Sequence, residues 1–267
     1  MKRFKTVHYT IHSNKIKDAR GIRFAVIADL HGMEFGPDNR KLLETIHRYR
    51  PDGILIAGDM IVRNDSASLK TASSLLRSLA QQYPVYYALG NHEYKLYRTD
   101  PQDNCMAARY QEYEKELKKA GIHILHNESC SLQVGKTSLT VYGLEVPLIY
   151  YKKPFSPQLK REEVRELIGE PSSLNILLAH SPKYGDTYFD WGADLILSGH
   201  YHGGIVRLGR HNGLLSPQLH PFPKFCCGDF HRKEQHMLVS AGAGEHTIPV
   251  RIHNPRELLM VDLKPNA

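Results

Sequence analysis

The feature that most constrains this chain is an alternation of apolar runs with helical patterns in its N-terminal part. The runs at residues 24–28, 53–57 and 85–89 are short and continuously apolar, as expected for strands buried on both faces. Between them, apolar residues recur at helical spacing over residues 42–49 and 69–79. This order of strands and helices predicts a central sheet of parallel strands that is covered by helices.

The remainder of the chain is richer in predicted strands. Helical patterns are present at 107–120 and 161–168, and strands are predicted at 122–125, 131–134, 138–144, 175–179, 194–197, 237–240 and 258–263. The sequence contains neither an internal repeat nor a low-complexity linker. Apolar residues make up 41% of the 267 residues, which is enough for a sizeable core. We therefore expect one α/β domain over residues 1–267.

The composition also bears on the location and the partners of this chain. No apolar run approaches the roughly 18 residues that span a bilayer, and residues 1–17 lack the apolar segment of a secretory signal. We therefore expect a cytoplasmic protein, for which peripheral membrane contact stays open. The net charge of +7 suits a small anionic substrate and gives only weak support to nucleic-acid binding. No protein partner is indicated.

Five of the predicted strands end in polar residues of a similar kind. In chain order, these residues are Asp29-Leu30-His31, Gly58-Asp59, Gly90-Asn91-His92-Glu93, His180 and Gly199-His200-Tyr201-His202-Gly203-Gly204. In open α/β sheets, ligands bind beyond the carboxyl ends of the strands. We therefore expect the five ends to converge on one site.

The chemistry of these residues indicates a metal site. Carboxylate, amide and imidazole groups without a thiolate are typical ligands of Mn²⁺, Fe or Zn²⁺, and not of a structural cysteine-type zinc site. Seven candidate ligands are too many for one tetrahedral ion, but they suit two ions roughly 3.5–4 Å apart that share a carboxylate. His200 and His202 stand at i and i+2, so both can face one ion only if the chain bends, which the flanking glycines permit.

Taken in this order, the blocks D-x-H, G-D, G-N-H-E, a histidine after a strand and G-H-x-H resemble the calcineurin-like metallophosphoesterases. The resemblance covers residues from about 22 to 204. Residues 200–204, together with Ala243-Gly244 and residues 249–251, are most similar to the bacterial phosphodiesterases related to YkuE and YaeI. The fold that this implies is a four-layer α/β/β/α sandwich with mixed sheets and a dimetal site at the C-terminal ends of the central strands.

The resemblance also implies a role for each site residue. Asp29, His31 and His202 would bind the first metal, and Asn91, His180 and His200 the second. Asp59 would bridge the two ions, and His92 would be the catalytic residue beside them. The ions would be divalent, with Mn²⁺ as the first expectation and Fe, Zn²⁺ or Ni²⁺ as alternatives.

The expected reaction is hydrolysis of a phosphodiester or pyrophosphate bond by a hydroxide that bridges the two metals. His92 would act on the departing oxygen or on the phosphoryl charge. One alternative is a pyrophosphatase that cleaves UDP-diacylglucosamine, with an apolar groove built from residues 147–151 and 221–225. Another is a sequence-tolerant nuclease, which would need a basic groove around the site. The roles of Tyr94, His246 and Arg251 stay open.

Overall fold

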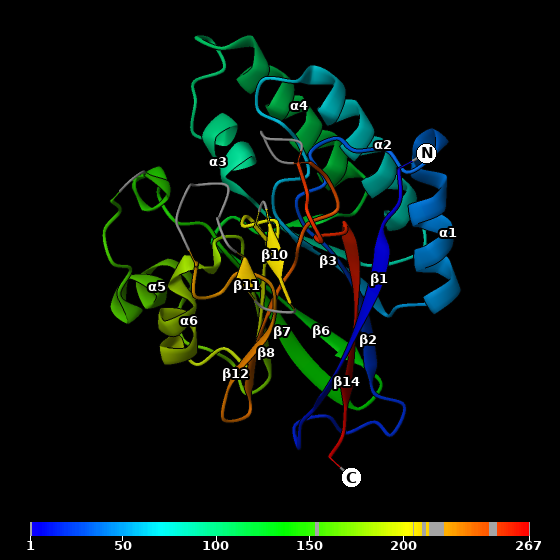
Figure 1. The fold of residues 1–267 in the computed structure, drawn as a ribbon, viewed down its shortest axis with the longest axis vertical. Helices are drawn as coiled ribbons and strands as arrows, with labels where there is room; N and C mark the ends of the chain where they lie inside the picture. Colours follow the sequence, from blue (N-terminus) through cyan, green and yellow to red (C-terminus); the bar gives the residue numbers. More distant parts are fainter. Residues whose placement is uncertain are drawn as a thin grey trace.

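The computed structural model describes residues 2–152, 155–204, 206–209, 212–213, 222–245 and 250–266. Within these ranges, the strands form two six-stranded sheets that pack against each other, and helices cover the outer face of each sheet (Figure 1). The layers run helix, sheet, sheet, helix, which confirms the predicted α/β/β/α sandwich. Across the described ranges, no helix is both long and apolar enough to cross a bilayer.

The first sheet contains the strands predicted in the N-terminal part. Its order is β1 (Lys5–His12), β14 (Glu257–Lys264), β2 (Ile22–Ile27), β3 (Gly53–Ala57), β4 (Val85–Ala88) and β5 (His123–Ile124). Strands β2 to β5 are parallel to one another, as the alternation of strands and helices predicted. Strand β14 is antiparallel to β2, so the sheet is mixed.

The second sheet has a parallel centre and antiparallel edges. Its order is β12 (Gly228–Arg232), β13 (Gln235–Val239), β9 (Leu195–Ser198), β8 (Asn175–Ala179), β7 (Thr137–Leu144) and β6 (Ser129–Val134). Strands β13, β9, β8 and β7 pair in parallel, whereas β12 and β6 form antiparallel pairs at the two edges. A short separate pair consists of β10 (Arg207–Leu208) and β11 (Asn212–Gly213).

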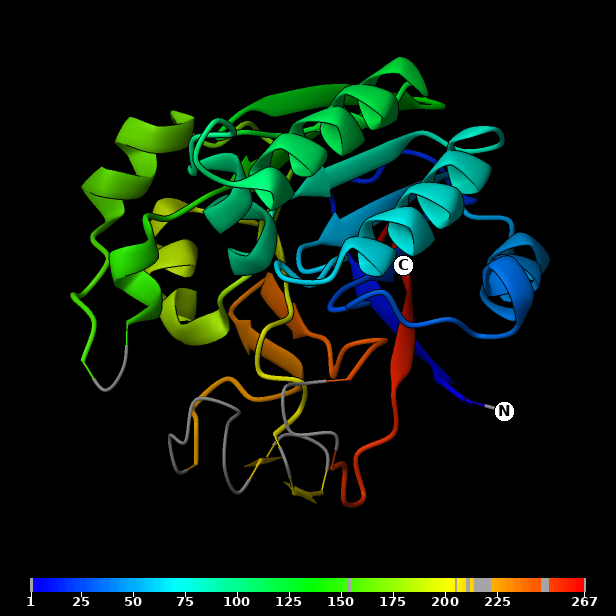
Figure 2. The same cartoon turned by 90° about the horizontal axis from the view of Figure 1, so that it is seen from above.

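The helices lie on opposite sides of this double sheet (Figure 2). The side of the first sheet carries α1 (Arg40–Tyr49), α2 (Ser66–Ala80), α3 (Asn91–Tyr97) and α4 (Cys105–Lys119). The side of the second sheet carries α5 (Arg161–Ile168) and α6 (Gly185–Trp191). Single turns of 3-10 helix are η1 (Pro37–Asn39), η2 (Leu148–Tyr151) and η3 (Pro182–Tyr184).

Strands that are apolar on both faces explain why four layers form. In β8, Ile176 and Leu178 belong to the core between the sheets, and Leu177 belongs to the core under α5 and α6. Since successive side chains of a strand point to opposite faces, a continuously apolar strand must be covered on both sides. Helices α2 and α4 begin where Asp65 and Asn104 accept hydrogen bonds from the first backbone amides.

The strand β1 was not among the predicted elements. Val7, Tyr9 and Ile11 alternate with polar residues, which is a pattern typical of a strand. Its partner is β14, paired in parallel from Lys5 with Glu257 onward, at the other end of the chain. The alternation could have indicated a strand, but no local pattern could have identified so distant a partner.

A buried histidine next to the first sheet makes stability depend on pH. His126 follows β5, and its ring nitrogens lie 2.8 Å from Glu114 of α4 and 2.8 Å from Glu145 after β7. Its side chain is 13% exposed. Burial opposes protonation, but the two carboxylates raise the pKa of His126 to about 9.

We predict that this histidine stabilises the fold most strongly at low pH. The pKa is higher in the folded state than the value of about 6.5 in an unfolded chain, so the stabilisation is complete below about pH 6.5 and is lost as the pH rises through about 9. In urea unfolding, His126→Gln should lower the free energy of unfolding by about 2–3 kcal/mol near pH 6 and by much less above about pH 9.5. The exposed His231→Gln is the control, and an equal loss at both pH values for His126→Gln would contradict this.

Candidate metal centre

The carboxyl ends of five strands meet at one edge of the double sheet, and the predicted site residues lie there. Asp29, Asp59 and His200 each follow their strand by two residues, and His180 follows β8 directly. Asn91 is the first residue of α3, after β4. The structure brings together all seven residues predicted as metal ligands, with His92 beside them.

Five of these residues have left-handed backbone conformations. The φ values are 51° at Asp29, 47° at His31, 53° at Asp59, 67° at His200 and 50° at His202. Such conformations are uncommon for residues with a side chain and cost of order 1–3 kcal/mol each. The loop after β2 and the loop after β3 hold each other in place, since the amides of Asp29 and His31 donate to the carbonyls of Gly58 and Asp59 at 3.0 and 3.1 Å. The left-handed conformations of His200 and His202 provide the bend that was expected between these two residues.

The first group of candidate ligands consists of Asp29, His31 and His202. The Nε2 atoms of His31 and His202 lie 3.2 Å apart. Asp29 Oδ1 lies 3.3 Å from His202 Nε2 and 3.9 Å from His31 Nε2. These atoms can surround one cation, because ligand bonds of about 2.0–2.2 Å place neighbouring ligand atoms at such separations.

The second group consists of Asp59, His180 and His200, whose ligand atoms all lie within 4.8 Å of one another. Asp59 Oδ2 lies 3.1 Å from His180 Nε2 and also 3.9 Å from His31 Nε2 of the first group. Asp59 thus stands between the two groups. Asn91 lines the same cleft, and its Oδ1 is buried without a hydrogen-bond partner in the described part of the chain.

Two observations show that these residues fit divalent cations. His180 Nδ1 lies 2.7 Å from the Ala57 carbonyl, which can only accept, so the neutral ring carries its proton on Nδ1 and its lone pair on Nε2. Among the described residues, Asn91 Oδ1 is buried without a hydrogen-bond partner, and the buried His180 Nε2 faces a carboxylate oxygen of Asp59, which cannot donate to its lone pair. Buried polar atoms normally have partners, and two atoms without partners at one site indicate a missing ligand.

The electrostatics of the site also favour a bound cation. Burial would raise the pKa of Asp29 and of Asp59, but the neighbouring histidines hold both pKa values well below the ordinary carboxyl value. Burial lowers the pKa of His31 to about 3, so this ring is neutral and can bind metal through its lone pair. The two adjacent buried carboxylates attract positive charge: although burial opposes protonation, Asp59 and Asp29 raise the pKa of His180 to about 10, so a proton on this ring supplies the charge that a bound cation would supply.

His92 lies at the open side of the same cluster. The Arg63 amide donates to His92 Nδ1 at 3.1 Å, so the neutral ring carries its proton on Nε2. The His92 amide donates to Asp59 Oδ1 at 2.9 Å. His92 also forms a third possible group with His31 and Asp59, so its distance from the cluster does not by itself separate a catalytic role from metal binding.

Glu93 is a residue whose contribution the sequence analysis did not recognise, although it belongs to the Gly-Asn-His-Glu block. It is completely buried and accepts hydrogen bonds from the amides of Asp59, Met60, Ile61 and Gly90 and from the hydroxyl of Tyr87. Burial and the charge of Asp59 raise the pKa of Glu93, whereas the hydrogen bonds from the backbone amides and from Tyr87 lower it and favour the carboxylate. This carboxylate holds the Asp59 loop against the start of α3.

We predict that Glu93→Gln destabilises the protein and weakens the site together. The amide nitrogen of glutamine cannot accept, so it would face N–H donors and leave buried groups unpaired, at a cost of about 2–4 kcal/mol. Urea unfolding and metal content after dialysis measure the two effects. Glu116→Gln, at an exposed position on α4, is the control and should change stability by less than about 0.5 kcal/mol. A fully stable Glu93→Gln protein would contradict this role.

Glycines are required where the loops approach most closely. A β-carbon at Gly90 would overlap the carboxylate of Asp59, and one at Gly199 would overlap the carboxylate of Asp29. Both glycines lie in the predicted motifs, and the close approach of the loops explains why no side chain fits there.

The three residues whose roles stayed open differ in what the structure shows. Arg251 is mostly buried and donates to the carbonyls of Ala241 and Gly244 at 2.8 and 2.6 Å. Its Nη2 lies 3.2 Å from His202 Nδ1. Tyr94 lies on α3 and is partly buried. His246 lies outside the described residues.

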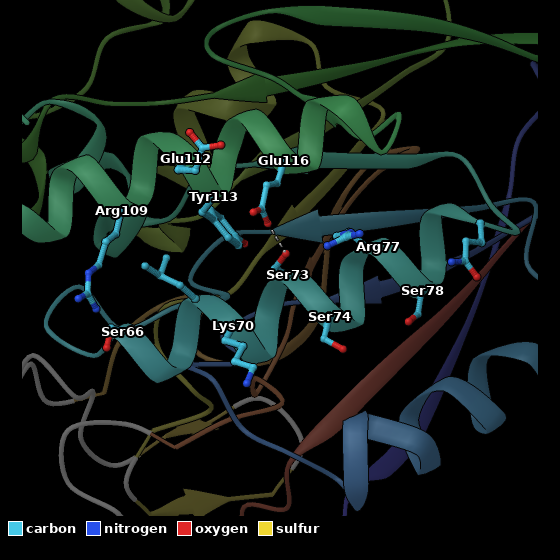
Figure 3. Close-up of a pocket in the computed structure, with 12 residues that line it drawn as sticks. Ser66, Lys70, Ser73, Ser74, Arg77, Ser78, Arg109, Glu112, Tyr113 and Glu116 are labelled. Atoms are coloured by element: carbon cyan, nitrogen blue, oxygen red, sulfur yellow. Dashed lines mark hydrogen bonds between the residues drawn. The ribbon is translucent and has the colours of Figure 1, made fainter.

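A cleft of about 340 Å³ opens over the cluster. Its lining residues are His31, Asp59, Val62, Asn91, His92, His200, His202 and Glu245. A separate groove of about 630 Å³ lies between α2 and α4, with Lys70 and Arg77 on one side and Arg109 on the other (Figure 3). Among the described residues, the groove shares no lining residue with the cleft, so none of the predicted ligands lines the groove.

The fold and the cleft define an α/β/β/α sandwich with His/Asp clusters, at the ends of its central strands, that could hold two metals. The chain belongs to the calcineurin-like phosphoesterase family, whose model matches residues 22–204. This confirms the resemblance predicted from the ordered motifs.

Individual relatives agree with this assignment. A candidate metallophosphoesterase of Caenorhabditis elegans, F40B5.2, is 27% identical over 96% of this chain and 53% of its own, so this chain spans about half of that relative's length. The uncharacterized metallophosphoesterase YkuE of Bacillus subtilis is 25% identical over 97% of this chain and 85% of its own. The UDP-2,3-diacylglucosamine pyrophosphatase LpxG of Chlamydia muridarum is 24% identical over 79% of this chain and 69% of its own.

A solved structure supports the fold alone. A candidate 5′-nucleotidase from Staphylococcus aureus superposes on 92% of this chain and 55% of its own with a TM-score of 0.52, at 12% identity. At this identity the likeness concerns the arrangement of sheets and helices.

Proposed function

We propose that this protein hydrolyses a phosphodiester or pyrophosphate bond of a small anionic substrate at a centre of two divalent cations. Asp29, His31 and His202 would hold one cation, Asn91, His180 and His200 the other, and Asp59 would bridge them. Mn²⁺ is the first expectation, with Fe, Zn²⁺ or Ni²⁺ as alternatives. The observation that carries the proposal is the pair of His/Asp groups that meet at Asp59, with His180 Nε2 and Asn91 Oδ1 left without hydrogen bonds.

Two cations at this position would neutralise the phosphoryl charge and lower the pKa of bound water toward about 7. The chain itself supplies the positioning. Asp59 is held by Glu93 through its amide and by the His92 amide through its carboxylate, so its place between the two groups is strongly determined. His92 presents its Nε2–H at the open side of the cleft, where it can hydrogen-bond to the departing oxygen or to a phosphoryl oxygen and stabilise the charge that develops there.

The test is hydrolysis by chelator-stripped protein after single metals are restored. We expect Mn²⁺ to restore cleavage of bis-p-nitrophenyl phosphate, with less activity on p-nitrophenyl phosphate. Cleavage of the monoester alone would replace the diesterase by a phosphatase. Cleavage of neither compound with Mn²⁺, Fe²⁺, Zn²⁺ or Ni²⁺ would contradict the proposed reaction. Hydrolysis of DNA that falls steeply with salt would support the nuclease alternative.

A second candidate function is a pyrophosphatase for a lipid-linked nucleotide sugar, as the name of the relative LpxG suggests. The observation in its favour is η2, which lies beside the site: the ring of Tyr151 packs edge-on against His200 at 5.2 Å, and Ile149 is 47% exposed. In the other segment of the predicted apolar groove, Phe222 is 67% exposed, and Pro221 lies outside the described residues. Faster cleavage of UDP-diacylglucosamine than of bis-p-nitrophenyl phosphate would favour this function.

A further inference from the structure

A second cleft, of about 590 Å³, lies next to the candidate metal centre. Its lining includes the side chains of Arg3, Arg251, Arg256, His253 and Glu245. Glu245 also lines the cleft over the metal centre, so the two hollows meet at this residue. Arg251 connects them as well, because its guanidinium lies 3.2 Å from the ring of His202.

Two arginines of this cleft have N–H donors without a hydrogen-bond partner among the described residues. Arg251 is 10% exposed and uses both terminal nitrogens on backbone carbonyls, but its Nε is buried and has no hydrogen-bond partner among the described residues. The Nε of Arg256 is likewise buried without a hydrogen-bond partner among the described residues. Buried donors without acceptors are costly, and hydrogen bonds from a charged guanidinium to phosphate or carboxylate are about twice as strong as neutral ones. The cleft is therefore suited to an anion.

One carboxylate already lies where such an anion would bind. Glu245 Oε2 lies 3.6 Å from the Nε of Arg251, and Glu245 Oε1 forms an ion pair with Arg256. The lining of the cleft contains three guanidinium groups and this single carboxylate, so the cleft keeps an excess of positive charge. The Glu245 side chain is 25% exposed, which leaves it able to move toward solvent.

We propose that Arg3, Arg251 and Arg256 form a subsite for a second phosphoryl group of the substrate, and that the Glu245 carboxylate fills this subsite when substrate is absent. The inference rests on the proposed function, because it takes the neighbouring cleft as the place where the first phosphoryl group reacts. It narrows the substrate class to phosphoesters and pyrophosphates that carry at least two phosphoryl groups. A glutamate that yields to the substrate would disfavour compounds with a single phosphoryl group.

UDP and UMP are a matched pair of probes, because they differ by one phosphoryl group. With Mn²⁺-restored full-length protein, both should inhibit cleavage of bis-p-nitrophenyl phosphate competitively, and UDP should inhibit at about tenfold lower concentration. Arg256→Gln should reduce this preference to about twofold or less, because one charge-assisted contact is lost. Glu245→Gln should increase the preference several-fold, because the competing carboxylate is gone.

The two substitutions are expected to change the preference for UDP over UMP in opposite directions, which distinguishes a subsite from a purely structural ion pair. If the ion pair between Glu245 and Arg256 were only structural, both substitutions would weaken binding alike, and that result would overturn the subsite. Equal inhibition by UDP and UMP, or inhibition by UDP that is not competitive, would also overturn it. Arg232→Gln, whose arginine lies on β12 and pairs with Asp190, is the control and should leave the preference unchanged.

Calorimetry separates a failure of the subsite from a failure of the proposed reaction. Binding of UDP and UMP to chelator-stripped protein does not require turnover. Tighter binding of UDP that depends on Arg256 would support the subsite, even if the protein cleaves no ester. Cleavage of bis-p-nitrophenyl phosphate without any preference for UDP would support the reaction and overturn the subsite.

Discussion

Asp59→Asn is expected to lower the affinity for metal by at least ~100-fold and to abolish most turnover. Asparagine has nearly the same shape but lacks the negative charge, and it offers only one oxygen to two cations. Changes around a metal ligand already cost 10–100-fold in affinity, so loss of a bridging carboxylate should cost at least that much. Asp59 Oδ2 also lies 3.1 Å from His180 Nε2. The substitution therefore also removes the negative charge from the second group of candidate ligands.

The measurement is metal content after dialysis, together with hydrolysis of bis-p-nitrophenyl phosphate. Asp186→Asn is a matched control, because Asp186 is exposed and pairs only with Lys224 among the contacts described. It should keep full metal content and activity. If Asp59→Asn retained two tightly bound ions, Asp59 would not be the bridge.

His92→Ala is expected to show a different result: both metals retained and turnover reduced by ~10²–10⁴-fold, the range typical when a catalytic hydrogen-bond or proton donor is lost. The reason lies in which atoms of His92 contact the site. The contact with Asp59 comes from the backbone amide of His92, at 2.9 Å, and alanine keeps that amide. The ring is held by the Arg63 amide and supplies its Nε2 proton to the cleft, and only this contribution is removed.

Metal content and kcat therefore decide the role of His92. A parallel loss of metal and turnover would instead make His92 a ligand, in the group that it forms with His31 and Asp59. His231→Ala, at an exposed position on β12, is the control for loss of an imidazole.

Local patterns were sufficient to predict most of the elements that carry the site. The helix expected at 161–168 is α5 with the same bounds, and the apolar run at 175–179 is β8. The motifs at the strand ends were recognisable because each one joins an apolar run to polar residues and glycine. That Asp29, Asp59 and His180 lie at the ends of strands could be predicted from this local pattern, whereas their roles remain predictions.

The contributions of Glu93 and Glu245 could not be predicted in the same way. Glu93 contacts Asp59 from 34 positions away, and the relevant fact is that five donors converge on it. Glu245 matters because the chain brings it to the junction of two clefts. Glu93 stands in the Gly-Asn-His-Glu block, but the block does not indicate which amides this side chain accepts from, and the residues around Glu245 do not indicate that it lies between two clefts.

The sequence by itself determined the kinds of element, their order and the chemical character of the strand ends, because these depend on neighbours along the chain. Only the tertiary structure decided which ends meet, that β1 pairs with β14, and that Asp59 lies between two groups of histidines. Those features depend on contacts between residues far apart in the chain, and on left-handed loop conformations that are stable only when the other loop is already in place.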